Sequence, residues 1–293
     1  MADLLEMGDG VLLKSGRPWT PRRPFYAVIG DPVAHSRSPA MQTAALGERG
    51  IAADYVALRL EPGRLGDLPQ VAGAQLLAGF NVTAPCKEAA ARLCAVLSPE
   101  ALQLGVVNTV RCEGGRWFGH NTDGGGLLAV MVEAWRRPLA PEAAVVLGAG
   151  ASARSAVAAL ARWGVSRITV RSRSTESRRR FADWAAGWDL QADVTVSELI
   201  PGGEDAPAAP SVWICCLAGG TARSAYLPAA AGKEPALLID LRYGDQLPPE
   251  TPPLGFQALD GLPVLLMQGG LAFASWFGPP VPWAAMRRAL AAD

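Results

Sequence analysis

The stretch that decides the fold is VVLGAGASARSAVAAL, residues 145–160. Gly148, Gly150 and Ala153 form a G-x-G-x-x-A pattern between an apolar strand and an Ala-rich helix that ends at Gly164. The first glycine permits a tight turn, the second lets backbone approach a pyrophosphate, and the small third residue lets helix pack on strand. The pattern predicts a dinucleotide site on the free N–H groups of the helix start, with an ordinary Gly-rich turn as the alternative. The residues expected at the phosphates are Gly148, Ala149, Gly150, Ala151 and Ser152.

Basic and hydroxyl side chains follow the next predicted strand, residues 167–172. An NAD site would carry an acidic residue about 20 positions after the glycines, where it binds the ribose hydroxyls. Ser172, Arg173 and Ser174 occupy that place instead. Guanidinium and hydroxyl donors suit a 2′-phosphate, so the sequence favours NADP over NAD. A solvated pair of Arg171 and Arg173 is the alternative.

Strand and helix patterns alternate on both sides of the glycine loop. Before it, strands are predicted at 25–29, 54–60 and 76–82, helices at 39–49, 62–72 and 85–97, a hairpin over 106–122 and a helix at 124–135. After it, strands are predicted at 143–148, 167–172, 192–197, 211–217 and 235–241, and helical spacing returns after Leu262. The alternation predicts an α/β protein with a mainly parallel N-terminal substrate lobe and a Rossmann-like NADP lobe.

Changes in composition and pattern along the sequence indicate where these lobes begin and end. Residues 1–24 are rich in Pro and Arg near their end and are interpreted as an extension that precedes the folded body. The substrate-binding and catalytic domain is predicted at 25–123 plus 265–293, because the C-terminal helices are expected to return to the first lobe. The NADP-binding domain is predicted at 124–264.

The composition excludes several classes of function. Positive and negative charges balance at 27 each, so no field attracts nucleic acid or an anionic membrane. No apolar stretch approaches the roughly 20 residues of a membrane span, and the start lacks a signal-peptide pattern. Five cysteines without a C-x-x-C pair and only two histidines make a metal site implausible. The expectation is a cytoplasmic protein with reduced thiols and no metal.

Lys87 is one of only three lysines among 27 basic residues. Pro85 suits the first turn of a helix, which places Lys87 at a strand-to-helix junction, where α/β sheets bind ligands. A cation is mildly unfavourable at a helix start, and unlike arginine a lysine can surrender its proton. Acid/base chemistry is therefore the hypothesis, and a solvated lysine is the alternative. Asn121, Thr122 and Asp123 form a second polar cluster. Taken by itself, this cluster would be explained by a helix cap.

Five motifs in order give the chain a family resemblance. They are HSRSP at 35–39, NVTAPCK at 81–87, VVNT at 106–109, NTDGGG at 121–126 and QGGLAFASWFG at 268–278, with the glycine loop between the last two. With these motifs the sequence resembles the shikimate dehydrogenase family from about Val28 to Gly278. The resemblance implies NADP-dependent interconversion of 3-dehydroshikimate and shikimate, a step of aromatic amino acid biosynthesis, and it leaves a homodimer open.

The resemblance also implies roles for individual residues. Lys87 and Asp123 would be the catalytic pair. The substrate-binding residues would be Ser36 and Ser38 at the carboxylate, Asn81, Thr83, Asn108 and Gln268 at the hydroxyls, and Tyr243. Leu217 would lie at the cofactor. Each has a structural alternative: Ser38 could be a helix N-cap, the two asparagines could bind local backbone, and Gln268 could be a surface residue.

The sequence departs from the family at three places. Cys215, Cys216 and Leu217 replace polar residues beside the nicotinamide, Gln42-Thr43 replaces His-Asn, and Asp245 replaces a proline. Three interpretations follow: a shikimate dehydrogenase, a relative acting on quinate or an amino analogue, and a non-catalytic nucleotide-binding regulatory paralogue.

Overall fold

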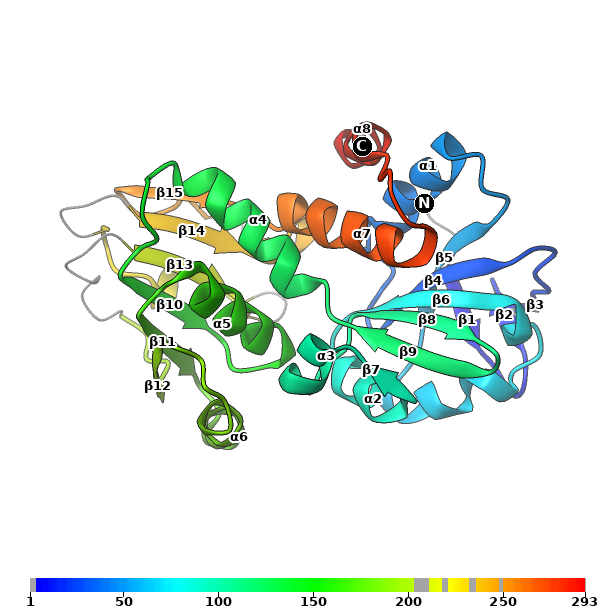
Figure 1. Cartoon of the computed structure of the whole chain (residues 1–293), viewed down its shortest axis with the longest axis horizontal. Helices are drawn as coiled ribbons and strands as arrows, with labels where there is room; N and C mark the ends of the chain where they lie inside the picture. Colours follow the sequence, from blue (N-terminus) through cyan, green and yellow to red (C-terminus); the bar gives the residue numbers. More distant parts are fainter. Residues whose placement is uncertain (1–3, 203–210, 218–220, 232–235, 248–249, 293) are drawn as a thin grey trace. The chain divides into compact units, whose positions relative to one another are not determined.

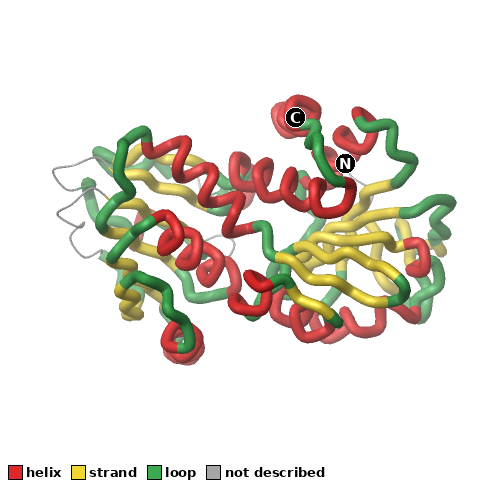
Figure 2. Tube along the Cα trace, viewed as in Figure 1, coloured by secondary structure: helices red, strands yellow, loops and turns green. Residues whose placement is uncertain are grey.

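The computed structural model divides the chain into two compact units, each described here by itself. The first unit contains residues Met1–Thr122 and Gln268–Asp293, and the second contains Asp123–Met267. The structure describes residues 4–202, 211–217, 221–231, 236–247 and 250–292. Figure 2 shows that each unit is built around a sheet with helices beside it.

The first unit has a mixed sheet that contains nine strands in the described residues, in the order β3-β2-β1-β5-β4-β6-β8-β9-β7. The strands are β1 (Leu4–Met7), β2 (Leu12–Lys14), β3 (Arg17–Pro18), β4 (Phe25–Gly30), β5 (Asp54–Arg59), β6 (Leu77–Val82), β7 (Val96–Leu97), β8 (Thr109–Glu113) and β9 (Arg116–His120). The central strands β5, β4 and β6 run parallel, so their carboxyl ends share one edge. The β8–β9 pair is the hairpin that the sequence predicts.

Residues 4–18 belong to the sheet of the first unit and are not an extension that precedes it. Strand β1 pairs in parallel with β5 and antiparallel with β2, so a hairpin extends the sheet beyond β5. Leu5 and Leu12 are fully buried in the core of this unit. The Pro-rich and Arg-rich part of residues 1–24 is only the segment that connects this hairpin to β4.

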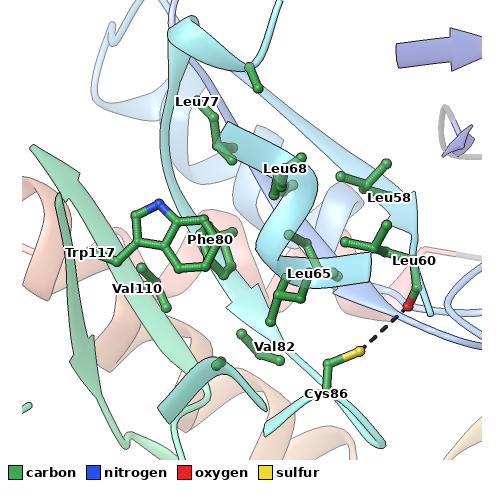
Figure 3. Close-up of a cluster of buried hydrophobic side chains, with 14 of the residues drawn as sticks. Leu58, Leu60, Leu65, Leu68, Leu77, Phe80, Val82, Cys86, Val110 and Trp117 are labelled. Atoms are coloured by element: carbon green, nitrogen blue, oxygen red, sulfur yellow. Dashed lines mark hydrogen bonds between the residues drawn. The ribbon is translucent and has the colours of Figure 1, made fainter. Parts of the chain in front are cut away.

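The segment expected to form a helix at 62–72 is instead a 3₁₀ helix, η1 (Pro62–Gln70), and a second short one, η2 (Ala74–Leu76), follows. Leu65 and Leu68 are fully buried, and Val71 is nearly so. Their spacing of three residues matches the 3₁₀ period, in which residues three apart share one face. Figure 3 shows both leucines packed over Phe80 and Val82 of β6.

The helices of the first unit are α1 (Ser38–Glu48), α2 (Lys87–Leu93), α3 (Pro99–Leu104), the later part of α7 (Leu262–Phe277) and α8 (Trp283–Ala291). The helix expected at 85–97 is shorter than predicted because Cys94 already has extended backbone, and β7 follows. Figure 1 shows α8 beside α1, in agreement with their contacts. The return of the C-terminal helices to the first unit is as expected.

The second unit is a Rossmann-like parallel sheet of six described strands in the order β12-β11-β10-β13-β14-β15. The strands are β10 (Ala143–Leu147), β11 (Arg167–Ser172), β12 (Asp193–Glu198), β13 (Ser211–Cys215), β14 (Ala236–Asp240) and β15 (Phe256–Leu259), the last of which the sequence analysis missed. Helices α4 (Asp123–Trp135) and α5 (Ala151–Trp163) run side by side over the sheet, and α6 (Thr175–Ala186) lies along β12 (Figure 1). In the described residues no helix has the length and apolar character needed to cross a membrane.

Candidate active site

The carboxyl edge of β4 and β6 positions the first polar residues of the site. The Thr83 N–H donates to the Ile29 carbonyl oxygen at 2.8 Å, which fixes the chain just after β6. Ser36 and Ser38 follow β4 at the start of α1, where the Ser38 N–H donates to the Ser36 Oγ at 3.3 Å. The N-cap of α1 is Arg37, without a side-chain cap. The buried Ser38 is therefore not the cap, and the alternative structural explanation does not hold.

Lys87 is the first residue of α2 and is only 8% exposed. The residue before it, Cys86, is fully buried, and its thiol donates to the Leu60 carbonyl oxygen at 3.4 Å (Figure 3). Burial raises the pKa of the Cys86 thiol to about 11, with a smaller contribution from the charge of Asp31, so the thiol stays a donor at neutral pH. This contact anchors the helix start that carries Lys87.

Backbone and side-chain bonds bring three of the motifs together within the first unit. The Val107 N–H donates to the Lys87 carbonyl oxygen at 3.1 Å. The next residue, Asn108, accepts at Oδ1 from the Thr122 N–H at 2.8 Å and donates from Nδ2 to the Thr122 Oγ1 at 2.9 Å. Val107 and Asn108, which are adjacent, thus hold the backbone of Lys87 and Thr122, the residue that directly precedes Asp123. Asp123 itself begins α4 in the second unit.

Asn81 lies in β6 and directs its amide into the protein. Its Nδ2 donates to the Asn108 carbonyl oxygen at 3.2 Å and to the Thr109 Oγ1 at 3.0 Å. Its Oδ1 accepts from the Tyr55 hydroxyl at 2.7 Å. Both amide hydrogens of Asn81 therefore bond within the protein, and its role at the substrate stays a prediction. Sequence reasoning missed Tyr55 and Thr109, because each sits in a strand pattern that burial alone explains.

Gln268 is brought to the same cluster from the far end of the sequence. Asn108 donates from Nδ2 to the Gln268 Oε1 at 3.2 Å. The next residue, Gly269, accepts at its carbonyl oxygen from the Gln42 Nε2 at 2.9 Å. Gln42 lies one helical turn after Ser38 in α1, so this departure from the family pattern ties the start of α1 to α7. Gln268 is half-buried in the cluster and is not an isolated surface residue.

The glycine loop of the second unit fits a dinucleotide. Gly148 has φ +109°, and a Cβ there would stand 3.0 Å from the Cys216 carbonyl oxygen, so only glycine is tolerated. A Cβ on Gly150 would meet nothing within 4 Å, which leaves its backbone open to a phosphate. Ala153, in the first turn of α5, is fully buried, and the helix has no side-chain cap. Ala151 and Ser152 supply N–H groups of its first turn.

The turn after β11 carries the candidate 2′-phosphate residues. Arg173 and Ser174 are exposed, whereas Ser172 is buried. Arg178 of α6 donates to the carbonyl oxygens of Ser172 and Arg173 at 2.7 and 3.0 Å, which orders the turn. Ser174 caps α6 by accepting from a backbone N–H. Arg171 is buried, with its guanidinium 5.8 Å from the Trp213 ring, so it is not half of a solvated pair.

An ion-pair cluster lies beside the Cys215–Leu217 departure. Asp240, which is fully buried at the end of β14, accepts from Arg242 at 2.8 and 2.9 Å and from Arg223 at 2.9 Å. Arg242 also donates to the Thr221 carbonyl oxygen at 2.7 Å. We name the Asp240, Arg242 and Arg223 set the arginine clamp, because it ties the chain after β13 to the end of β14.

Two residues predicted near the cofactor or substrate also belong to the second unit. The Leu217 side chain is 7% exposed and packs in an apolar cluster with Leu147 and Trp213. Tyr243 follows the arginine clamp directly, is partly exposed and starts the short helix η4 (Gly244–Gln246). Asp245 lies in η4, where the family's proline is absent.

Comparisons with known proteins show which family has a similar sequence and fold. Residues 28–110 match the model of the shikimate dehydrogenase substrate binding domain. A shikimate dehydrogenase (NADP(+)) of Anaeromyxobacter sp. (strain Fw109-5) is 40% identical over 284 residues, which cover 93% of this chain and 98% of that relative. The chain belongs to the shikimate dehydrogenase family. It is therefore an oxidoreductase that acts on a CH–OH group and uses NADP.

Solved structures of the family extend the comparison. Shikimate 5-dehydrogenase of Thermus thermophilus, solved with NADP(H) and shikimate, has a TM-score of 0.69 and 30% identity, and covers 92% of this chain and 98% of that one. The 5-ketofructose reductase of Gluconobacter sp. strain CHM43 has a TM-score of 0.76 and 25% identity, and covers 92% and 98%. An enzyme named for a different substrate thus has a similar fold.

Replacing Arg173 is expected to weaken NADP binding selectively. Arg173→Ala removes a charge-assisted donor for the 2′-phosphate, which corresponds to about 10- to 100-fold in the dissociation constant for NADP. Binding of NAD, which has no 2′-phosphate, should change by less than about threefold. Arg179→Ala, on the exposed face of α6, is the matched control. Equal losses for NADP and NAD, measured by calorimetry, would exclude Arg173 as the phosphate ligand.

Proposed function

We propose that this chain interconverts shikimate and 3-dehydroshikimate. The observation that carries the proposal is the polar cluster of the first unit, in which Asn108 joins Lys87, Thr122 and Gln268 through direct bonds or adjacent residues. Motifs that are far apart in the sequence thereby bring several amide and hydroxyl groups together beside the backbone of Lys87. Such a set suits a small molecule that carries several hydroxyls.

Lys87 is the acid and base of the proposed reaction. When bound, NADP supplies the hydride acceptor or NADPH the hydride donor. In the direction of oxidation the Lys87 amine takes the proton of the reacting hydroxyl, and in reduction the ammonium returns it to the carbonyl oxygen. The carboxylate of Asp123 accepts a hydrogen bond from the same hydroxyl and orients it. The buried position of Lys87 keeps this proton from exchanging freely with water.

The remaining residues orient the substrate. Ser36 and Ser38, at the start of α1, donate to the carboxylate, where the helix N-terminus also favours negative charge. Thr83 and the amides of Asn108 and Gln268 bind ring hydroxyls, with Asn81 in support. Tyr243 contributes its hydroxyl from the second unit. Two serines leave the carboxylate end uncrowded, which favours shikimate over quinate.

A substrate panel tests the proposal. The purified chain is assayed for NADP reduction with shikimate, quinate and no substrate, and for NADPH oxidation with 5-ketofructose, with NAD and NADH in parallel. We expect kcat/KM for shikimate with NADP to exceed that of every other pair by at least about tenfold. A higher kcat/KM with quinate or a ketose would assign the site to that substrate.

Binding without turnover is the outcome that favours the regulatory paralogue. It would show as a measurable dissociation constant for NADP and no NADPH formation with any substrate. The presence of both Lys87 and Asp123 argues against it. We further propose that the enzyme is cytoplasmic and forms homodimers. Light scattering of the purified chain tests the homodimer directly.

A further inference from the structure

A chain of buried hydrogen bonds runs from Tyr55 to Gln268 within the first unit. The Tyr55 hydroxyl donates to the Asn81 Oδ1 at 2.7 Å, and the Asn81 Nδ2 donates to the Thr109 Oγ1 at 3.0 Å. Thr109 then donates to the Asn108 Oδ1 at 3.0 Å, and the Asn108 Nδ2 donates to the Gln268 Oε1 at 3.2 Å. We call this series the Tyr55 relay.

Every step of the Tyr55 relay has the same donor direction. Two backbone groups confirm the orientation of its amides, because the Asn108 carbonyl oxygen can only accept from Asn81, and the Thr122 N–H can only donate to Asn108. At the end of the relay Gln268 receives a hydrogen bond at Oε1. Its Nε2 therefore carries the donors, and a ligand group that Gln268 binds through this amide nitrogen must be an acceptor.

The Tyr55 relay is buried where it begins. Tyr55 is 6% exposed, Asn81 6% and Thr109 fully buried, so water cannot replace a lost partner easily. Removing one hydroxyl leaves the buried Asn81 Oδ1 without its tyrosine donor, and such a group costs far more than an exposed one. Without this donor the Asn81 side-chain amide is no longer held in one orientation. Thr109, and through it Asn108, then lose a partner of fixed position.

We infer that Tyr55 is a positioning residue of the substrate site, which acts through Asn81 and Thr109 to hold Asn108 and Gln268 as directed hydrogen-bond partners of substrate hydroxyls. This inference rests on the proposed function, since it takes shikimate as the substrate. Tyr55 lies in β5 and touches no reacting atom. Its role is to fix which side of each amide faces the ligand.

The structure offers a matched control for this tyrosine. Tyr26 is the residue paired with Tyr55 across β4 and β5, and it is 8% exposed. Both rings pack near Trp276, at centroid distances of 4.8 Å for Tyr26 and 6.3 Å for Tyr55. Tyr55 alone of the two donates to Asn81. Tyr26→Phe therefore removes a tyrosine hydroxyl at the paired position of the neighbouring strand without touching the Tyr55 relay.

The experiment measures shikimate binding by calorimetry without cofactor, together with KM and kcat. We expect Tyr55→Phe to raise the dissociation constant and KM for shikimate about tenfold, with the dissociation constant for NADP within about twofold of wild type. Tyr26→Phe should leave shikimate binding within about twofold. Equal shikimate affinity of the two tyrosine variants would overturn the inference. If the wild-type chain itself binds no shikimate, the proposed function fails instead.

A second pair of variants checks the path. Thr109→Val removes the relay hydroxyl at nearly constant volume, whereas Thr109→Ser keeps it. We expect Val to weaken shikimate binding about as much as Tyr55→Phe does, and Ser to restore most of the affinity. In the double variant Tyr55→Phe/Thr109→Val the losses should be less than multiplicative, because both break one series. Fully multiplicative losses would show that Tyr55 does not act through Thr109.

Discussion

Lys87→Arg is expected to lower kcat by about 10²-fold or more, while the dissociation constants for NADP and shikimate stay within about threefold of wild type. A guanidinium keeps the positive charge but does not release its proton in proteins, so the substitution separates charge from proton transfer. Lys87→Ala, which removes both, should lose at least as much. Steady-state kinetics with calorimetry of each ligand gives the comparison.

The control for this prediction is another lysine. Lys14 lies in β2, in the N-terminal hairpin, and Lys14→Arg should leave kcat unchanged within about twofold. Because Lys87 starts α2 beside the anchoring Cys86, circular dichroism and thermal melting must show that the variant stays folded. A folded Lys87→Ala variant with near-normal turnover would refute the assignment of Lys87 as acid and base.

Asp240→Asn is expected to destabilise the second unit by about 3–5 kcal/mol. The carboxylate is fully buried and pairs with both Arg242 and Arg223, so its loss leaves the buried Arg242 guanidinium without its ion-pair partner and Arg223 with only Glu250, at 3.9 Å. The measurement is the free energy of unfolding from urea titration. Asp193→Asn, at the exposed start of β12, is the matched control and should change stability by less than about 0.5 kcal/mol.

The arginine clamp also predicts how this stability depends on pH. Burial alone would raise the pKa of Asp240, but the hydrogen bonds from Arg242 and Arg223 together hold the pKa below its ordinary value. A lowered folded-state pKa means that the unfolded chain binds the proton more tightly. The stability difference between wild type and Asp240→Asn should therefore be constant above about pH 5 and shrink below about pH 4, where the unfolded aspartate titrates. A difference that shrinks between about pH 8 and about pH 6 would contradict this.

The parts of the fold that could be predicted are those that local chemistry dictates. The glycine loop was predictable because a φ of +109° at Gly148 requires glycine and because the unobstructed backbone at Gly150 suits the approach of a phosphate. The η1 segment was not, because Pro62 and Pro69 compete with an apolar spacing that resembles a helix. Strand β1 was missed because this short strand depends on its pairing with β2 and with β5, and β5 lies much later in the chain.

The residue types of the candidate site were visible in the sequence, but their connections were not. Nothing local shows that Tyr55 bonds to Asn81, or that Asn108 bonds to Gln268 across 160 positions. The same holds for Cys215, for which the sequence indicates only a loss of polar contacts. In the structure its buried thiol, with a pKa of about 11 raised mainly by burial, lies 3.7 Å from an Arg242 nitrogen. Side-chain pairs of this kind depend on how strands and helices pack, which sequence spacing does not encode.

The most direct test of the account is a single-turnover measurement of NADPH oxidation by 3-dehydroshikimate, with enzyme in excess, for wild type and Lys87→Arg. This readout isolates the chemical step from product release. Proton transfer through Lys87 predicts rapid oxidation by wild type, with a rate that depends on pH, and a rate at least about 10²-fold lower for Lys87→Arg. Equal single-turnover rates for the two proteins would show that no proton passes through residue 87.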